Sequence, residues 1–180
     1  MKLGIMTRHL LLAVSAALSL TSCAEPIIPR QQVFHVPDYT ASQGRGSATI
    51  AGRVFVTMRD NSERIGAHEQ VELVAVTPYT EEIMEVEFTQ SRTLSPSDPR
   101  FQKYIRSTQT DDQGRFAFHG LPAGEYFVTS NVEWEHWFWN DDLTQKVYVH
   151  DTVPIHSRVA VKGGQAVAVS DWIYGRTIAK

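Results

Sequence analysis

Residues 112–128, DQGRFAFHGLPAGEYFV, carry the most informative pattern in this chain of 180 residues. The stretch begins with a predicted hairpin turn, because the Asp112 side chain can bond nearby backbone N–H groups and Gly114 can adopt a positive φ. Phe116 and Phe118 then alternate with small or polar residues. This alternation predicts a strand that places both aromatic rings on one buried face.

A second reversal follows at residues 120–124, GLPAG. Pro122 fixes its own φ and restricts Leu121 to extended backbone, and Gly124 has no Cβ to resist a tight bend. Tyr126 then begins the inward face of the next strand. Chain reversal and packing therefore explain these residues without a ligand, and we expect a Gly124→Val substitution to disrupt folding.

The same alternation of apolar and polar residues recurs on both sides of this stretch. Residues 48–58 and 69–77 have the period of two that is typical of half-buried strands. Near the C-terminus, Gly163 and Gly164 separate two valine-rich runs within residues 159–169, which predicts a closing hairpin. The chain should therefore fold mainly into strands from residue 48 onward.

Together these motifs resemble the carboxypeptidase regulatory-like family of transthyretin-like domains. The resemblance covers residues 48–172, and its strongest part runs from residue 110 to residue 128. It implies an all-β fold, a Greek-key β-sandwich of transthyretin-like or immunoglobulin-like type with about seven strands. It also implies a binding or structural role, but a shared fold alone does not establish function.

The N-terminus is organised like a bacterial lipoprotein signal peptide. Basic residues precede an uncharged run at residues 10–20, LLLAVSAALSL, which as a helix is too short for a ~30 Å hydrocarbon core. The run ends in Leu20-Thr-Ser-Cys23, which resembles a lipobox, and Cys23 is the only cysteine. We predict lipidation of Cys23. The alternatives are an ordinary secretory signal with a chance cysteine, or a short apolar helix of the fold.

The predicted organisation has four segments. Residues 1–22 are the signal peptide, residues 23–47 are the lipidated N-terminus with a flexible proline-rich tether, residues 48–172 are the sandwich, and residues 173–180 are a C-terminal tail. Lipid chains on one residue would anchor the protein in a membrane. The absence of aspartate after Cys23 implies, by the lipoprotein resemblance, an exported protein in the outer membrane that faces the periplasm.

Several classes of function are disfavoured by the sequence. The formal net charge is -3 and the basic residues are dispersed, so nucleic acid is not an expected partner. The chain has no His-Glu-x-x-His motif for zinc and no Gly-x-Ser-x-Gly nucleophile motif. We therefore predict no catalytic residues, no metal and no cofactor, and we predict that the protein is not an enzyme. A hydrolase with an unrecognised site remains an alternative.

Residues 78–108 form an insertion that is longer than a usual sandwich connection. Thr77 and Pro78 could cap and begin a helix, whereas apolar residues alternate with glutamates through residues 83–90 as in a strand. We favour a strand over residues 83–90. One helical turn near residues 97–104 and a strand over residues 105–110 should follow.

The candidate binding residues lie in residues 132–142, VEWEHWFWNDD. Trp134 is expected to end its strand beneath the insertion. The next three aromatic residues are consecutive, so a strand cannot bury all of them on one face. At least one should be exposed, in a patch that could contact protein or glycan. The candidate binding residues are Trp134, His136, Trp137, Phe138 and Trp139.

Two functions are compatible with this patch. The favoured one is a lipid-anchored, non-catalytic module that binds an envelope protein or has a structural role. The alternative is a carbohydrate-binding module that uses the loop from Trp137 to Trp139. Exposed, coplanar tryptophan rings would favour sugar, whereas rings buried against the insertion in a second small core would favour a structural role.

Overall fold

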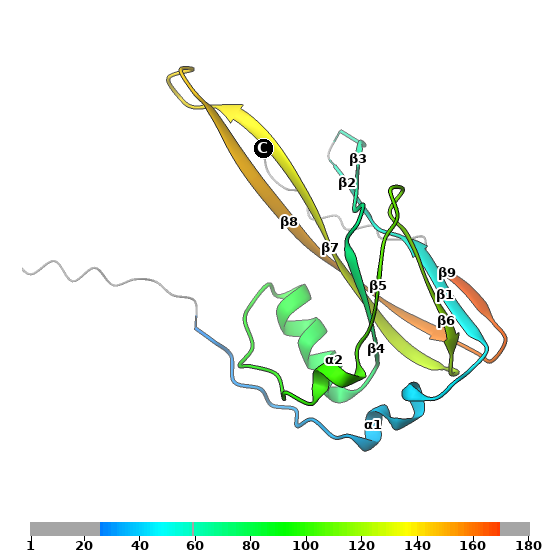
Figure 1. Ribbon diagram of the computed structural model, residues 1–180. Helices are drawn as coiled ribbons and strands as arrows, with labels where there is room; N and C mark the ends of the chain where they lie inside the picture. The colour runs from blue at the N-terminus through cyan, green and yellow to red at the C-terminus, as the bar shows by residue number, and fades with distance from the viewer. Residues whose placement is uncertain (1–25, 59, 170–180) are drawn as a thin grey trace, which may run out of the picture.

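A computed structural model describes residues 26–58 and 60–169, and it confirms the predicted all-β sandwich (Figure 1). One sheet has the strand order β6-β1-β9, and the other has the order β5-β4-β7-β8. A small third sheet pairs β2 with β3. The strands are β1 (Ala48–Arg53), β2 (Phe55–Thr57), β3 (Glu63–Ile65), β4 (Gln70–Ala75), β5 (Arg106–Gln109), β6 (Arg115–Leu121), β7 (Gly124–Trp139), β8 (Lys146–Val161) and β9 (Ala166–Val169).

The main hydrophobic core lies between the two larger sheets. Residues that alternate along each strand enter it, as the period of two requires. The three-stranded sheet contributes Ile50, Phe116, Phe118 and Val169, and the four-stranded sheet contributes Val71, Leu73, Tyr126, Val128, Val132 and Ile155. Burial of these apolar side chains is the main stabilising contribution to the fold.

The turn before β6 lies where the sequence places it, but it is not the predicted hairpin, because β5 belongs to the four-stranded sheet and β6 to the three-stranded sheet. Gly114 has a φ of 74°, in the left-handed region. The carboxylate that orders the turn belongs to Asp111, whose Oδ1 accepts hydrogen bonds of 2.9 Å from the backbone N–H groups of Gln113 and Arg115. Asp112 instead lies beside His68, with 2.9 Å between Asp112 Oδ1 and His68 Nε2.

Two glycine-rich connections, at residues 120–124 and 162–165, differ from the predicted reversals. Each of them crosses from one sheet to the other. Strand β6 ends at Leu121 in the three-stranded sheet, and β7 begins at Gly124 in the four-stranded sheet. The Tyr126 hydroxyl donates a hydrogen bond of 3.0 Å to the Pro122 carbonyl across this connection. The predicted closing hairpin is also wrong, since β9 leaves β8 and pairs in parallel with β1. Alternation indicates which face a side chain takes, but not which sheet its strand joins.

The insertion is helical where a strand was favoured. It contains α2 (Pro78–Ile83), the π-helical segment η2 (Met84–Thr89) and the short 3₁₀ helix η3 (Phe101–Tyr104). Thr77 Oγ1 accepts a hydrogen bond from the Thr80 N–H, and Thr80 Oγ1 accepts one from the Thr77 N–H. This reciprocal cap, with Pro78 in the first turn, starts the helix. The strand predicted over residues 83–90 is therefore wrong, whereas η3 and β5 lie close to their predicted positions.

Residues 26–46 pack against the domain and do not form a flexible tether. They contain α1 (Pro37–Thr40) and the 3₁₀ turn η1 (Ala41–Gln43). Phe34 and Tyr39 are buried, and the Tyr39 hydroxyl lies 2.9 Å from Thr77 Oγ1. Burial raises the pKa of Tyr39 to about 12. The segment is fixed to the domain by these two buried aromatic side chains, which its proline-rich composition did not reveal.

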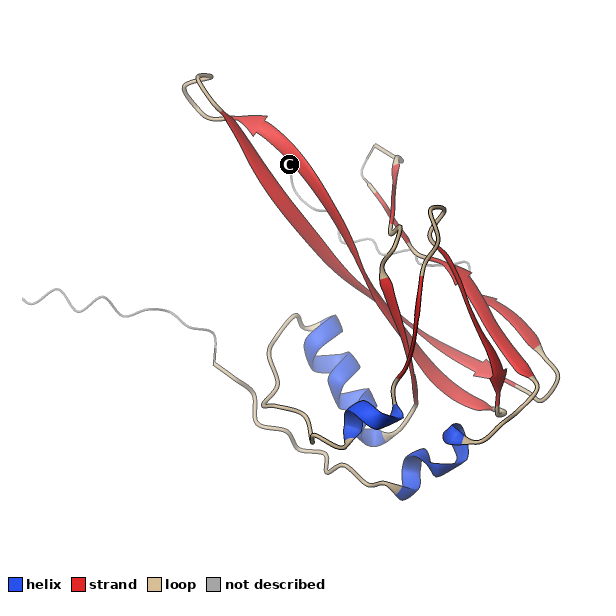
Figure 2. Cartoon of the chain, in the orientation of Figure 1, coloured by secondary structure: helices blue, strands red, loops and turns tan. Residues whose placement is uncertain are grey.

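A second hydrophobic cluster joins this N-terminal segment, the insertion and the four-stranded sheet. It covers the outer face of the sheet, opposite the main core, and the helices gather on this side of the molecule (Figure 2). Its members include Phe34, Tyr39, Val74, Tyr79, Ile83, Phe101 and Phe127. Within the described residues, no helix is long and apolar enough to cross a membrane. The predicted signal peptide, Cys23 and C-terminal tail lie outside the described residues.

Gly52 and Gly124 provide a matched test of the packing. A Cβ on Gly52 would lie 2.6 Å from the Val169 carbonyl oxygen and 2.8 Å from the Phe116 ring. A Cβ on Gly124 would lie no closer than 3.6 Å to any neighbouring atom outside the adjacent residues, and Gly124 does not have a positive φ. Neither crowding at a Cβ nor a positive φ therefore supports the expectation that Gly124→Val disrupts folding.

We expect Gly52→Ala to lower the free energy of unfolding by about 2 kcal/mol and the thermal midpoint by about 6 °C, because it overpacks the core. Gly124→Ala should change the free energy of unfolding by less than about 0.5 kcal/mol. Thermal unfolding followed by circular dichroism measures both. Equal decreases in the free energy of unfolding for the two variants would contradict the conclusion that Gly52, and not Gly124, is sterically crowded.

Candidate functional site

Strands β7 and β8 extend beyond the rest of the sandwich as a two-stranded arm. They pair along their whole length, from Gly124↔Val161 to Trp139↔Lys146. Strand β4 pairs with β7 only as far as Ser130. Residues 132–153, which we name the aromatic arm, have their base against the main core and project from there away from the body of the domain (Figure 1).

The two faces of the aromatic arm continue the two faces of the four-stranded sheet. Val132 lies in the main core, so Trp134, His136 and Phe138 share its inner face. Trp137 and Trp139 lie on the outer face, with Tyr148 and Lys146 as their partners in the ladder. Trp137, Phe138 and Trp139 are 48%, 49% and 47% exposed. The three consecutive aromatic residues are thus half exposed and divided between opposite faces.

Trp134 differs from the other candidate residues because it packs at the base of the arm. It is partly buried against the main core, as is Val153 on the adjacent strand. It does not end its strand, which continues to Trp139, and it does not lie beneath the insertion. The position predicted for Trp134 was wrong because the inner face of β7 turns toward the core, whereas the insertion covers the outer face.

The rings of Trp137 and Trp139 are nearly perpendicular, and the Lys146 ammonium group lies beside them. Their ring centroids are 6.1 Å apart and their planes meet at 86°. The Lys146 ammonium lies 3.8 Å from the centroid of Trp137 and 5.8 Å from that of Trp139. Such cation–π contacts contribute roughly 0.5–1 kcal/mol at exposed sites. The rings are therefore neither coplanar nor buried against the insertion, so neither predicted arrangement is present.

Polar contacts hold the arm on both faces and at its tip. His136 Nδ1 lies 3.1 Å from Asp151 Oδ2 on the inner face, and His150 Nε2 lies 3.3 Å from Glu133 Oε2 on the outer face. At the tip, Asn140 Oδ1 accepts hydrogen bonds from the backbone N–H groups of residues 144 and 145. In the described part of the chain, no group of three histidine, cysteine or acidic side chains could hold a metal ion.

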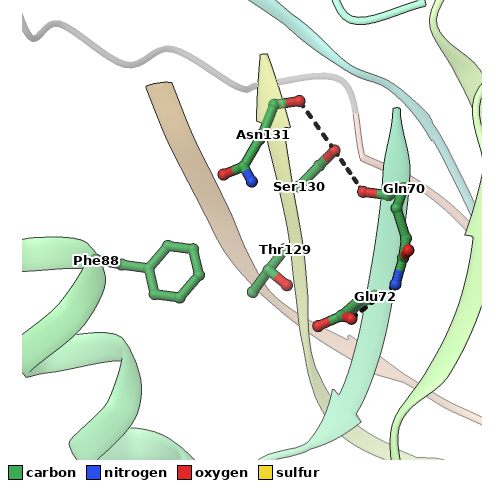
Figure 3. A pocket seen from close by; sticks show the side chains of 6 residues that line it. All are labelled: Gln70, Glu72, Phe88, Thr129, Ser130 and Asn131. Carbon is green, nitrogen blue, oxygen red and sulfur yellow. Dashed lines mark hydrogen bonds between the residues drawn. The ribbon is translucent and has the colours of Figure 1, made fainter. Parts of the chain in front are cut away.

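A pocket that the sequence did not reveal lies on the outer face of the four-stranded sheet. Its volume is about 310 Å³. Figure 3 shows its lining, which comprises Gln70, Glu72, Phe88, Thr129, Ser130 and Asn131. Phe88 was assigned to a predicted strand, so no sequence signal placed it above β4 and β7. Its position depends on the helical path of the insertion.

Burial shifts the pKa of two groups close to the four-stranded sheet. It lowers the pKa of His156, which lies beside Phe88 with 5.4 Å between the ring centroids. Burial also raises the pKa of Glu69, whose Oε1 accepts a hydrogen bond of 3.2 Å from the Glu133 backbone N–H. Desolvation disfavours the charged form in both cases.

No protein-family model matches this chain, and no curated protein matches its sequence. Among solved structures, the fold is similar to that of a candidate carbohydrate-binding protein from Pseudomonas aeruginosa. The TM-score is 0.61 and the sequence identity is 25%, over 77% of this chain and 97% of the other. The likeness agrees with the β-sandwich described above.

The exposure of the arm predicts that its tryptophans differ in how much they contribute to the free energy of unfolding. The Trp137→Ala/Trp139→Ala double variant should keep the wild-type free energy of unfolding within about 1 kcal/mol, because neither ring belongs to a core cluster. Trp134→Ala should lower the free energy of unfolding by about 2 kcal/mol or more, because it removes a ring that packs on the core. Guanidinium unfolding followed by far-UV circular dichroism makes the comparison. A larger decrease in the free energy of unfolding for the double variant than for Trp134→Ala would show that Trp137 and Trp139 stabilise the fold.

Proposed function

We propose that this protein is a non-catalytic binding module of the bacterial cell envelope, and that the aromatic arm is its recognition surface. The observation that carries this proposal is the concentration of exposed apolar side chains. Six of the ten large apolar residues exposed in the described part of the chain lie on the arm: Trp137, Phe138, Trp139, Leu143, Val147 and Tyr148. A concentration of exposed apolar side chains in one segment is typical of interaction sites.

A protein is the partner that best fits the arm. Aromatic side chains are enriched in the centres of protein interfaces, and the arm presents them on both faces. Strand β8 lies at the edge of its sheet, so its outer backbone groups could pair with a strand from a partner. The perpendicular tryptophan rings and the Lys146 ammonium leave no flat platform for a sugar ring.

Carbohydrate binding is the second candidate function. The similar Pseudomonas aeruginosa structure supports it, because that protein is a candidate carbohydrate-binding protein. Exposed tryptophans beside carboxylate and amide side chains also have the chemistry that sugars require. This candidate differs from the first in the ligand, and the same arm variants test both.

The sequence motifs support an envelope location for this function. We propose that residues 1–22 are removed as a signal peptide, and that lipidated Cys23 anchors the protein in the outer membrane, facing the periplasm. The motif from residue 110 to residue 128 supports a place in the carboxypeptidase regulatory-like family. The binding role then requires no catalytic residue.

An affinity pull-down tests the arm. Full-length protein is incubated with detergent-solubilised envelopes beside the Trp137→Ala/Trp139→Ala variant and an Ile27→Ala/Val33→Ala control. The control removes two exposed apolar side chains that lie outside the arm. We expect a specific partner with wild type and control and at least a tenfold smaller yield with the arm variant, equivalent to about 1.4 kcal/mol.

The chemistry of the captured partner separates the two candidates. Protease treatment of the envelopes should abolish capture of a protein, whereas periodate treatment should abolish capture of a glycan. Equal recovery with the wild type, arm variant and control would contradict the role of the arm.

The anchor has a separate test. Cys23→Ser should move the protein from the membrane fraction to the soluble fraction, because no thiol remains to carry a lipid. Fractionation of cells together with metabolic labelling by an alkyne fatty acid measures the change. Labelling that persists in Cys23→Ser would refute lipidation at this residue.

A further inference from the structure

We propose that the pocket beneath Phe88 binds one neutral sugar unit through the floor formed by β4 and β7. This site is distinct from the aromatic arm, and the proposal does not depend on what the arm binds. It rests on three observations: a pocket open to solvent, an aromatic side chain at its wall, and polar side chains on its floor that form no hydrogen bond within the described part of the chain.

The floor of the pocket follows from the register of two adjacent strands. Glu72 on β4 is paired with Thr129 on β7, so their side chains project from the same face of the sheet. Gln70 and Asn131 lie two residues further along their strands and share this outer face. Four polar side chains therefore share the face of the sheet beside Phe88, and Thr129 lies toward its ring (Figure 3).

The wall of the pocket is held in place by the insertion. Phe88 belongs to the π-helical segment η2, and it packs partly against the second hydrophobic cluster. Its ring also contacts His156 from β8 in an edge-on arrangement. The π-helical winding is closed by the Gln90 N–H, which donates a hydrogen bond of 3.0 Å to the Glu85 carbonyl. π-Helical turns are rare and frequently occur at functional sites.

The hydrogen bonds in the pocket leave specific groups available. The Ser130 hydroxyl donates to the Gln70 carbonyl, and the Gln70 side-chain amide donates to Glu72 Oε1, each at 2.9 Å. Among the described residues, neither the Asn131 side-chain amide nor the Thr129 hydroxyl forms a hydrogen bond. Asn131 supplies two donors and one acceptor, and Thr129 can either donate or accept.

This combination of groups matches a ligand with adjacent hydroxyl groups. Each sugar hydroxyl both donates and accepts, so two or three adjacent hydroxyl groups can bond the Asn131 amide, the Thr129 hydroxyl and the free oxygen of Glu72 between them. The nonpolar side of a sugar ring can lie against Phe88. Glu72 is the one charged side chain of the lining, and its carboxylate disfavours phosphate or carboxylate ligands.

The size of the pocket limits the ligand. Its volume of about 310 Å³ lies at the lower end of the range for small-molecule pockets, which is roughly 300–1,000 Å³. One sugar unit therefore enters, and neighbouring units of an oligosaccharide lie outside. Weak binding is expected, with a dissociation constant of about 1 mM, as the small contact area implies.

The test is a titration followed by amide nuclear magnetic resonance. ¹⁵N-labelled full-length protein in a detergent without a sugar headgroup is titrated with cellotetraose, maltotetraose, mannotetraose and chitotetraose, each to about 10 mM. We expect saturable shifts for at least one sugar at the amides of residues 70–72 and 129–131. Phe88→Ala and Asn131→Ala should each weaken this binding about tenfold or more.

Controls separate the pocket from the arm and from folding. Phe88→Leu keeps an apolar wall without the aromatic ring, and Gln109→Ala removes an exposed amide from the adjacent strand β5 outside the pocket. Phe88→Leu should weaken binding, whereas Gln109→Ala and Trp137→Ala/Trp139→Ala should leave the pocket shifts unchanged. Asn131 is exposed, so Asn131→Ala should fold normally and remains informative if Phe88→Ala does not fold.

Three results would overturn the proposal. The first is the absence of saturable pocket shifts with all four sugars. The second is a set of shifts confined to residues 134–148, which would place sugar binding on the arm and support the second candidate function. The third is pocket binding of butylammonium with no response to sugar, which would identify Glu72 as part of a cation site. Loss of arm-dependent capture alone would leave the pocket result intact.

Discussion

The antiparallel ladder between β7 and β8 is the interaction on which the rest of the structure depends. Each strand has 16 residues, and they pair without interruption from end to end. One half of the ladder closes the main core through Val128 and Ile155, and the other half forms the aromatic arm. Because side chains alternate strictly along both halves, the register that buries Val132 also places Phe138 and Trp137 on opposite faces.

The outer face of the four-stranded sheet changes character within two residues, and this change positions the pocket. Val74 and Phe127 form a ladder pair that is covered by the insertion, whereas the next outer-face pair, Glu72 and Thr129, is polar. The insertion can bury only the apolar part of the sheet without leaving polar groups unsatisfied. Phe88 lies at this boundary, so the pocket combines an aromatic wall with a polar floor.

The sequence predicted features that depend on local geometry and missed those that depend on distant contacts. Alternation located the strands of the core, and Gly114 located a turn, because both require only neighbouring residues. The same alternation could not assign β9 to the opposite sheet. In the insertion, alternating glutamates outweighed the Thr77 cap, and a helix was mistaken for a strand. Exposure of consecutive aromatic residues followed from the pattern, whereas the angle between the Trp137 and Trp139 rings did not.

The packing of residues 26–46 has a consequence for how the domain would stand on a membrane. Ile28 forms backbone hydrogen bonds to Thr93 and Ser95, so the folded body begins five residues after Cys23. A fully extended chain of that length spans at most roughly 18 Å. With the lipid proposed at Cys23, the part of the insertion that pairs with Ile28 would stay within about 18 Å of the lipid headgroups. Partners would then be selected by their height above the bilayer as well as by their surface chemistry.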